Sequence, residues 1–77
     1  MEKDLIEYIA KSIVDNPSAV SVSVEEKETV TLLELKAAPE DTGKLIGKGG
    51  RIAKALRTVL QAAAVKSGKH PVLEIID

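Results

Sequence analysis

The spacing of apolar residues predicts a helix and two strands in the first half of the chain. Between residues 3 and 15 apolar side chains recur every three or four positions, and Asn16-Pro17 ends this amphipathic helix. The stretch AVSVSV then alternates strictly and predicts a strand with one apolar face, formed by Val20, Val22 and Val24. A polar segment at 25–28 predicts a hairpin turn. The return strand, 29–36, contains a Leu-Leu pair, which predicts partial burial of both its faces.

The second half predicts two helices and a last strand. The segment 38–41 carries a proline and acids typical of a first helical turn, and Gly47 ends this short helix. A longer helix follows from 50 to about 66, where Ser67-Gly68 ends it. Its predicted apolar face comprises Ile52, Leu56, Val59, Leu60 and Ala63. The opposite face is predicted to carry Arg51, Lys54 and Arg57. The final strand, VLEII, begins after Pro71.

The order helix, strand, strand, helix, helix, strand predicts an α+β fold of two layers, with a three-stranded sheet and helices packed on one face. Because a helix pair separates the second and third strands, those two strands are expected to be parallel neighbours. The 77 residues predict a single domain, 1–77, without cysteines to form disulfides. The charged N-terminus does not resemble a signal peptide and no stretch is apolar enough to span a membrane, so we expect a cytoplasmic protein.

Charge is segregated along the chain, although the formal net charge is only −1. Residues 1–42 contain ten acids and four bases. Residues 43–70 contain seven bases and no acid. A solvated helix face needs some lysines, but an acid-free run of 28 residues is more than such a face requires. The pattern predicts a positive surface for an anionic partner.

Three glycines fall within positions 47–50, between the two predicted helices. Glycine weakens a helix interior by roughly 0.5–1 kcal/mol relative to alanine, so these positions need an explanation. A turn without β-carbons lets another backbone approach closely, and the helix that follows directs its free N–H groups and positive dipole end to the same place. Lys48 and Arg51 add full charges beside it. The turn therefore predicts a binding site for phosphate groups.

The glycine spacing excludes the common nucleotide-binding loops. A P-loop needs four residues between its glycines, but Gly43 and Gly47 are separated by three, and Gly49 stands where a Ser or Thr is required. The Gly-x-Gly-x-x-Gly dinucleotide pattern does not fit either. The basic segment has no acid and only one histidine, His70, to act as a base or metal ligand. We therefore expect no enzyme activity, no cofactor and no metal.

A helix–GxxG–helix with an isoleucine directly before the first glycine resembles the KH domain, whose loop clamps the backbone of about four nucleotides. The matching stretch runs from Ile46 to Arg51. The helix and strand that precede the strand–helix–helix–strand unit correspond to type II, the prokaryotic arrangement, with order α-β-β-α-α-β. The resemblance covers nearly the whole chain. The run GKLIGKGGRIAKALRTVLQAAA and the short length are most similar to stand-alone bacterial KH proteins.

The resemblance implies roles for ten residues. The phosphate clamp would consist of Gly47, Lys48, Gly49 and Gly50. An apolar groove for the bases would be lined or supported by Ile46, Ile52 and Leu56. Phosphates or base edges would be within reach of Arg51, Lys54 and Arg57. One position departs from the family pattern, because Ala53 stands where many KH domains carry a branched aliphatic residue. This departure predicts a shallower and less sequence-selective groove.

Two functions remain open at this point. The first is non-catalytic binding of single-stranded RNA, as an RNA chaperone or post-transcriptional regulator, and the resemblance implies a partner KH protein. The second is a protein-interaction module that forms homodimers or heterodimers, with a purely structural glycine turn. The alanines of LQAAAVKSG suit close helix contact, either in the core or across a dimer. Neither function requires a membrane or a small-molecule substrate.

Overall fold

The computed structural model describes residues 2–76 and confirms the predicted α+β class and the order α-β-β-α-α-β. Its principal elements are α1 (Glu2–Ile13), β1 (Ser21–Glu26), β2 (Val30–Lys36), α2 (Pro39–Ile46), α3 (Arg51–Ala63) and β3 (His70–Ile76). Two short turns of 3-10 helix, η1 (Pro17–Ala19) and η3 (Val65–Ser67), lie between them. The segment η2 (Lys48–Gly50), between α2 and α3, is a turn whose Gly49 has a non-helical backbone conformation. No α-helix among these residues combines the length and hydropathy needed to span a bilayer.

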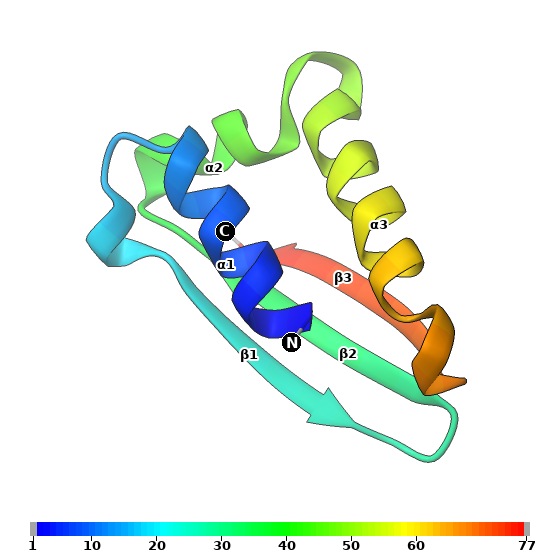
Figure 1. Ribbon diagram of the computed structural model, residues 1–77. Helices are drawn as coiled ribbons and strands as arrows, with labels where there is room; N and C mark the ends of the chain where they lie inside the picture. The colour runs from blue at the N-terminus through cyan, green and yellow to red at the C-terminus, as the bar shows by residue number, and fades with distance from the viewer. Residues whose placement is uncertain (1, 77) are drawn as a thin grey trace.

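The sheet has the strand order β1-β2-β3, so β2 is central. β1 and β2 form an antiparallel hairpin, while β2 and β3 are parallel neighbours, as the sequence predicts. All three helices lie on one face of the sheet, with α1 against β1 and α3 against β3 (Figure 1). The Leu-Leu pair divides between the two faces, because Leu33 points into the core and Leu32 is half-buried on the opposite face. This confirms the predicted partial burial of both faces.

The core lies between the helices and the sheet and is built from aliphatic side chains. Its most deeply buried members are Ile6, Ala10, Leu33, Leu35, Leu45, Leu56, Leu60 and Leu73. Val20 and Val22 are also buried, as the alternation predicts. Val24 is not, because its side chain is 41% exposed. Glu25 and Glu26, which follow it to the end of β1, are exposed as well, so the buried part of this strand ends at Val22.

The predicted apolar face of α3 is wrong at Val59, whose side chain is 38% exposed. The stripe that meets the sheet instead consists of Ala53, Leu56, Leu60 and Ala64. Both stripes have helical spacing, and they differ by a rotation of the helix about its own axis. α3 also ends at Ala63, three residues before the predicted end, and η3 continues it as a tighter turn.

Candidate nucleic-acid interface

Gly47 forms a close-packed corner between α2 and α3. Its N–H donates to the Gly43 carbonyl at 2.9 Å, which closes the last turn of α2. Its φ of 78° and ψ of 169° fall in a region that is essentially restricted to glycine. A β-carbon added there would lie 2.5 Å from Cγ1 and 2.9 Å from the backbone nitrogen of Ile52. The first glycine of the motif is therefore required by the protein's own packing.

Gly49 and Gly50 differ from Gly47 because the space in front of them is open. Both have a positive φ, at 66° and 79° respectively, and ψ values of 18° and 14°. A β-carbon added at either position would meet no atom of the protein within 4 Å. The turn is closed by a 3.1 Å hydrogen bond from the Gly50 N–H to the Gly47 carbonyl. The second half of the motif thus presents main chain that another backbone can approach.

Positive charge surrounds this open main chain. The side chains of Lys48, Arg51 and Lys54 belong to exposed residues, and within residues 2–76 they form no hydrogen bond or ion pair with another side chain or with the backbone. α3 begins at Arg51 with no acid in its first turn and no side-chain cap at Gly50. The Gly50 and Arg51 N–H groups donate within the turn, to the Gly47 and Lys48 carbonyls. The positive end of the helix dipole is not offset by an acid here and remains available to an anion.

A shallow cavity of about 180 Å³ lies between α3 and the edge strand β3. Its walls are formed by Arg57, Leu60, Gln61, His70, Pro71, Val72 and Leu73. The His70 N–H donates to the Thr29 carbonyl, on the side of β2. The backbone groups of successive residues in a strand point to opposite sides, so those of Pro71 point to the free edge of the sheet. Proline is suited to that position, because no N–H is needed there for the sheet.

Arg57 lies beside this cavity rather than on the far side of α3, where its sequence position predicted it. Its Nε and Nη2 groups donate to the Leu73 carbonyl at 3.4 and 3.3 Å. The guanidinium therefore bridges α3 and the free edge of β3. Because arginine has five N–H donors, the contact with one carbonyl leaves others available.

The three apolar residues assigned to the groove are exposed to different extents. Ile46 is 40% exposed, and Ile52 is half-buried beneath Gly47. Leu56 is 2% exposed, so it can support a groove from beneath but cannot line one. Ala53 is also buried, at 5% exposure.

Of the residues that form the cavity wall, only Arg57 was predicted as a site residue. Sequence reasoning missed the other six, namely Leu60, Gln61, His70, Pro71, Val72 and Leu73. Gln61 follows Arg57 by one helical turn, which is the signal that could have placed it on the same side of α3.

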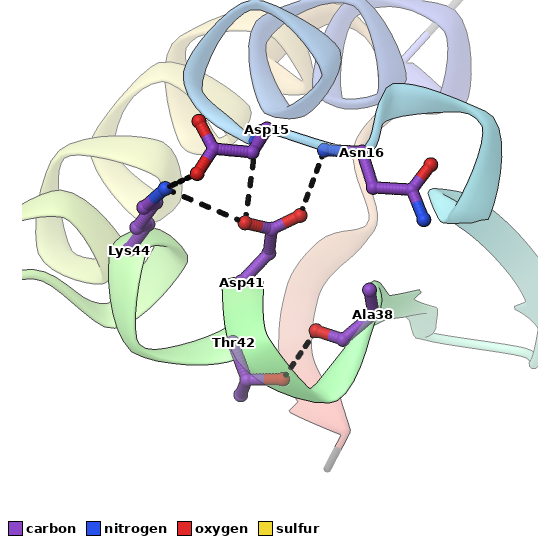
Figure 2. Close-up of polar contacts among 6 residues, drawn as sticks. All are labelled: Asp15, Asn16, Ala38, Asp41, Thr42 and Lys44. Atoms are coloured by element: carbon purple, nitrogen blue, oxygen red, sulfur yellow. Dashed lines mark hydrogen bonds and ion pairs between the residues drawn. The ribbon is translucent and has the colours of Figure 1, made fainter.

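A buried polar cluster at the start of α2 was also missed by sequence reasoning (Figure 2). The Asp41 carboxylate is 0% exposed and accepts N–H groups from Asp15 at 3.2 Å and Asn16 at 2.9 Å. Lys44 forms ion pairs with Asp15 and, at 3.6 Å, with Asp41. Lys44 is therefore engaged within the protein. The signal for burial was the position of Asp41 one helical turn before Leu45, on the same face of α2.

The surroundings of Asp41 and Lys44 favour the charged form of each. Burial alone would raise the pKa of Asp41, but the backbone N–H groups of Asn16 and Asp15 and the nearby Lys44 together hold that pKa below its ordinary value. The hydrogen bond to Asp15 in turn raises the pKa of Lys44. Both groups are therefore charged at neutral pH. Within residues 2–76, no group of three or more His, Cys, Asp or Glu side chains is arranged to hold a metal ion.

Comparison with known proteins places the chain in a family. A family model described as "KhpA/KhpB, KH domain" matches residues 3–75. The chain belongs to this family of KH domains. The RNA-binding protein KhpA of Clostridium acetobutylicum is 62% identical over 74 residues, which cover 96% of this chain and 99% of that protein. The RNA-binding protein KhpA of Treponema pallidum is 52% identical over 77 residues, which cover 100% of this chain and 96% of that protein.

A solved structure supports the fold independently. In the crystal structure of an Era variant from Aquifex aeolicus bound to GDP and aluminium fluoride, a matching region superposes with a TM-score of 0.71. The match covers 96% of this chain and 29% of that chain, at 16% sequence identity. At this identity the likeness concerns the fold alone. The names of the KhpA relatives describe binding proteins and not enzymes, in agreement with the prediction of a non-catalytic protein.

Proposed function

We propose that this chain binds single-stranded RNA without catalysis, through the GxxG loop and the groove between α3 and β3. The observation that carries this proposal is the open main chain at Gly49 and Gly50, which lies at the start of α3 between exposed cations. The relatives named RNA-binding protein KhpA support the same conclusion. The chain as a whole, 1–77, then acts as one type II KH domain.

The loop and the groove have different tasks in this proposal. A ribose-phosphate backbone lies against the main chain of Gly47 to Gly50, where N–H groups and the helix dipole favour negative charge. Lys48, Arg51 and Lys54 neutralise neighbouring phosphates. The bases enter the groove beside β3, supported by Ile46, Ile52 and Leu56. The remaining donors of Arg57 contact a base edge or a phosphate.

Charge reversal in the loop tests the RNA-binding site. The variant Lys48→Asp with Gly49→Asp changes the charge by three units, and neither position is close-packed. The matched control, Lys27→Asp with Ser23→Asp, makes the same change at exposed positions on the β1–β2 hairpin. Binding of a fluorescent random-sequence oligoribonucleotide is measured by anisotropy. We expect the loop variant to lose binding and the control to retain it.

The fold of the loop variant decides between this proposal and the structural interpretation of the glycines. We expect its circular-dichroism spectrum to match that of the native protein. Its melting temperature should fall by no more than about 4–8 °C, the effect of about 1 kcal/mol from a side chain at the positive φ of Gly49. Equal loss of RNA affinity in both double variants would show that only net charge matters and would contradict a loop site. Unfolding of the loop variant alone would favour a turn whose role is purely structural.

A second candidate function is association with another KH protein, either a second copy or a KhpB-like partner. The observation in its favour is that two helices carry exposed large apolar side chains, Val59 on α3 at 38% exposure and Tyr8 on α1 at 73%. Sedimentation velocity tests it with Val59→Asp against the neighbouring control Thr58→Asp, which is also exposed. A dimer lost only in the Val59 variant supports association through α3. A native protein that sediments as a monomer, and that a KhpB-type domain does not retain in a pull-down, excludes it.

These two functions are compatible, because the loop and Val59 are separate features of the surface. A small KH protein that both grips RNA and pairs with a second KH protein is suited to act as an RNA chaperone or post-transcriptional regulator. We place that activity in the cytoplasm, where its RNA substrates are made. Crosslinking to cellular RNA, compared between the native loop and the Asp-substituted loop, would identify these substrates.

A further inference from the structure

The buried Asp41 carboxylate joins two segments that are distant in sequence. Its Oδ1 accepts the N–H of Asp15 and its Oδ2 accepts the N–H of Asn16, across separations of 26 and 25 residues. Both donors lie in the linker that leaves α1 (Figure 2). A fully buried charge is retained only where such bonds compensate for the loss of water. The carboxylate therefore fastens α2 to the end of α1.

The element that Asp41 fastens also carries the candidate RNA site. α2 has eight residues and runs directly into Gly47. At 1.5 Å per residue it is about 12 Å long, so a rotation at its first turn is passed to the loop at its last. Leu45, which is completely buried, is the apolar anchor one turn beyond Asp41. Apolar packing around Leu45 is not directional, whereas the two hydrogen bonds of Asp41 have fixed directions and therefore also restrict the orientation of the helix.

We propose that Asp41 is a positioning residue for RNA binding, which sets the orientation of the GxxG loop by holding α2 against the linker at residues 15–16. This inference rests on the proposed function. Lys44 completes the cluster, because its ammonium faces both Asp15 and Asp41. It neutralises the buried carboxylate and is thereby kept away from the phosphate surface.

Two isosteric substitutions separate positioning from electrostatics. Asp41→Asn replaces one accepting oxygen with an NH₂ group, which then faces a backbone N–H donor. Asp15→Asn is the matched control, because its side chain is 79% exposed and its own backbone N–H is unchanged. Both variants remove one negative charge beside Lys44. Long-range electrostatics alone would therefore make both bind RNA slightly more tightly. Positioning predicts the opposite sign for Asp41→Asn.

The primary measurement is the affinity for a fluorescent oligoribonucleotide at fixed salt. We expect Asp41→Asn to bind RNA about tenfold more weakly. This is the size of effect seen when a residue that orients a metal ligand through a hydrogen bond is lost. Asp15→Asn should bind RNA within about twofold of the native protein. Ile6→Val, which perturbs the core away from the loop, controls for stability and should retain native affinity. Equal affinities in Asp41→Asn and Asp15→Asn would overturn the proposal.

Amide hydrogen exchange provides a second measurement that does not depend on RNA. The N–H groups of Gly47 and Gly50 are hydrogen-bonded within the loop region. We expect them to exchange faster in Asp41→Asn than in Asp15→Asn or Ile6→Val. Faster exchange at Asn16 alone, with the loop amides unchanged, would show that Asp41 has only a local structural role and would overturn the proposal.

If Asp41→Asn does not fold, the same inference can be tested by hydrogen exchange of the native protein. Exchange is then followed at increasing urea concentrations below the unfolding transition. If Asp41 couples the two segments, the amides of Asn16 and Gly47 become exposed in one opening event, with the same free energy and urea dependence. Independent opening of these amides would overturn the proposal. If the native protein binds no RNA, the proposed function fails, and these exchange measurements still decide whether Asp41 orients the loop.

Discussion

Replacing Gly47 with alanine tests the structural half of the glycine turn. Its backbone conformation, φ 78° and ψ 169°, is disfavoured for any residue with a β-carbon, at about 1–3 kcal/mol. The new methyl group would also lie 2.5 Å from Cγ1 of Ile52 and 2.9 Å from its backbone nitrogen. Rotation of the Ile52 side chain can relieve the first overlap but not the second. Overpacking of this kind adds about 1–3 kcal/mol. Reduced freedom of the unfolded chain offsets about 0.4–1 kcal/mol, so the effects together predict a loss of about 1–5 kcal/mol in the free energy of unfolding.

Gly49→Ala is the matched comparison, because the same methyl group is added two residues away. Its φ of 66° is also positive, but no atom lies within 4 Å of the added carbon. The left-handed conformation costs about 1–2 kcal/mol. Reduced freedom of the unfolded chain offsets about 0.4–1 kcal/mol of this, so the net loss is about 1 kcal/mol.

Urea denaturation followed by circular dichroism measures both variants. Both variants share the strain of a positive φ and the unfolded-state effect, so their difference is chiefly the overpacking at Gly47, about 1–3 kcal/mol. Proteins of this size have an m value of about 1 kcal/mol per molar urea, so the midpoints should differ by roughly 1–3 M. Gly47→Ala is expected to be the less stable. With a native stability near the low end for small domains, about 5 kcal/mol, it is largely unfolded in water only if the loss lies at the upper end of its range. Equal midpoints for the two variants would refute the assignment of Gly47 as the close-packed corner.

Three further predictions concern charge and packing. Because the pKa of Asp41 is lowered in the folded state, its stabilising contribution is complete above its ordinary value of 3.8 and is lost as the pH falls through the folded-state value. An acid titration of unfolding should therefore be less steep for Asp41→Asn, and identical slopes would contradict this. The affinity for RNA should decrease with salt with a log–log slope of about −2, from three phosphate contacts at about −0.7 each, and Lys54→Ala should reduce the slope by about 0.7. A slope that Lys54→Ala leaves unchanged would exclude that contact. Leu33→Ala, at a fully buried position, should destabilise the fold by about 2–5 kcal/mol in urea denaturation, and a loss below 1 kcal/mol would contradict its place in the core.

Periodicity predicts the order of elements and the sheet topology because those features depend on local patterns. Alternation at Val20 and Val22 and helical spacing before Asn16-Pro17 each need only a few neighbouring residues to be recognised. The parallel pairing of β2 with β3 follows from the length of the connection through α2 and α3. The glycine motif is local as well, and the structure forms the turn between α2 and α3 where the sequence places it.

Features that depend on tertiary packing were not predictable in the same way. The rotation of α3 that buries Ala53 and exposes Val59 is decided by how closely the helix approaches the sheet, and both faces have helical spacing. The burial of Asp41 depends on backbone N–H groups 25 and 26 residues away. The contact of Arg57 with the Leu73 carbonyl likewise depends on a strand that is remote in sequence. In each case the deciding partner is distant along the chain.

The most direct test of the RNA-binding proposal is an NMR titration of the ¹⁵N-labelled protein with a short single-stranded oligoribonucleotide. The account predicts that the amide signals of Gly47 to Arg51 shift first and furthest, followed by those along the side of α3 that faces β3. The same titration at high salt should give smaller shifts at equal RNA concentration, because phosphate contacts weaken. Shifts confined to the uncovered face of the sheet, with the loop signals unmoved, would contradict the account.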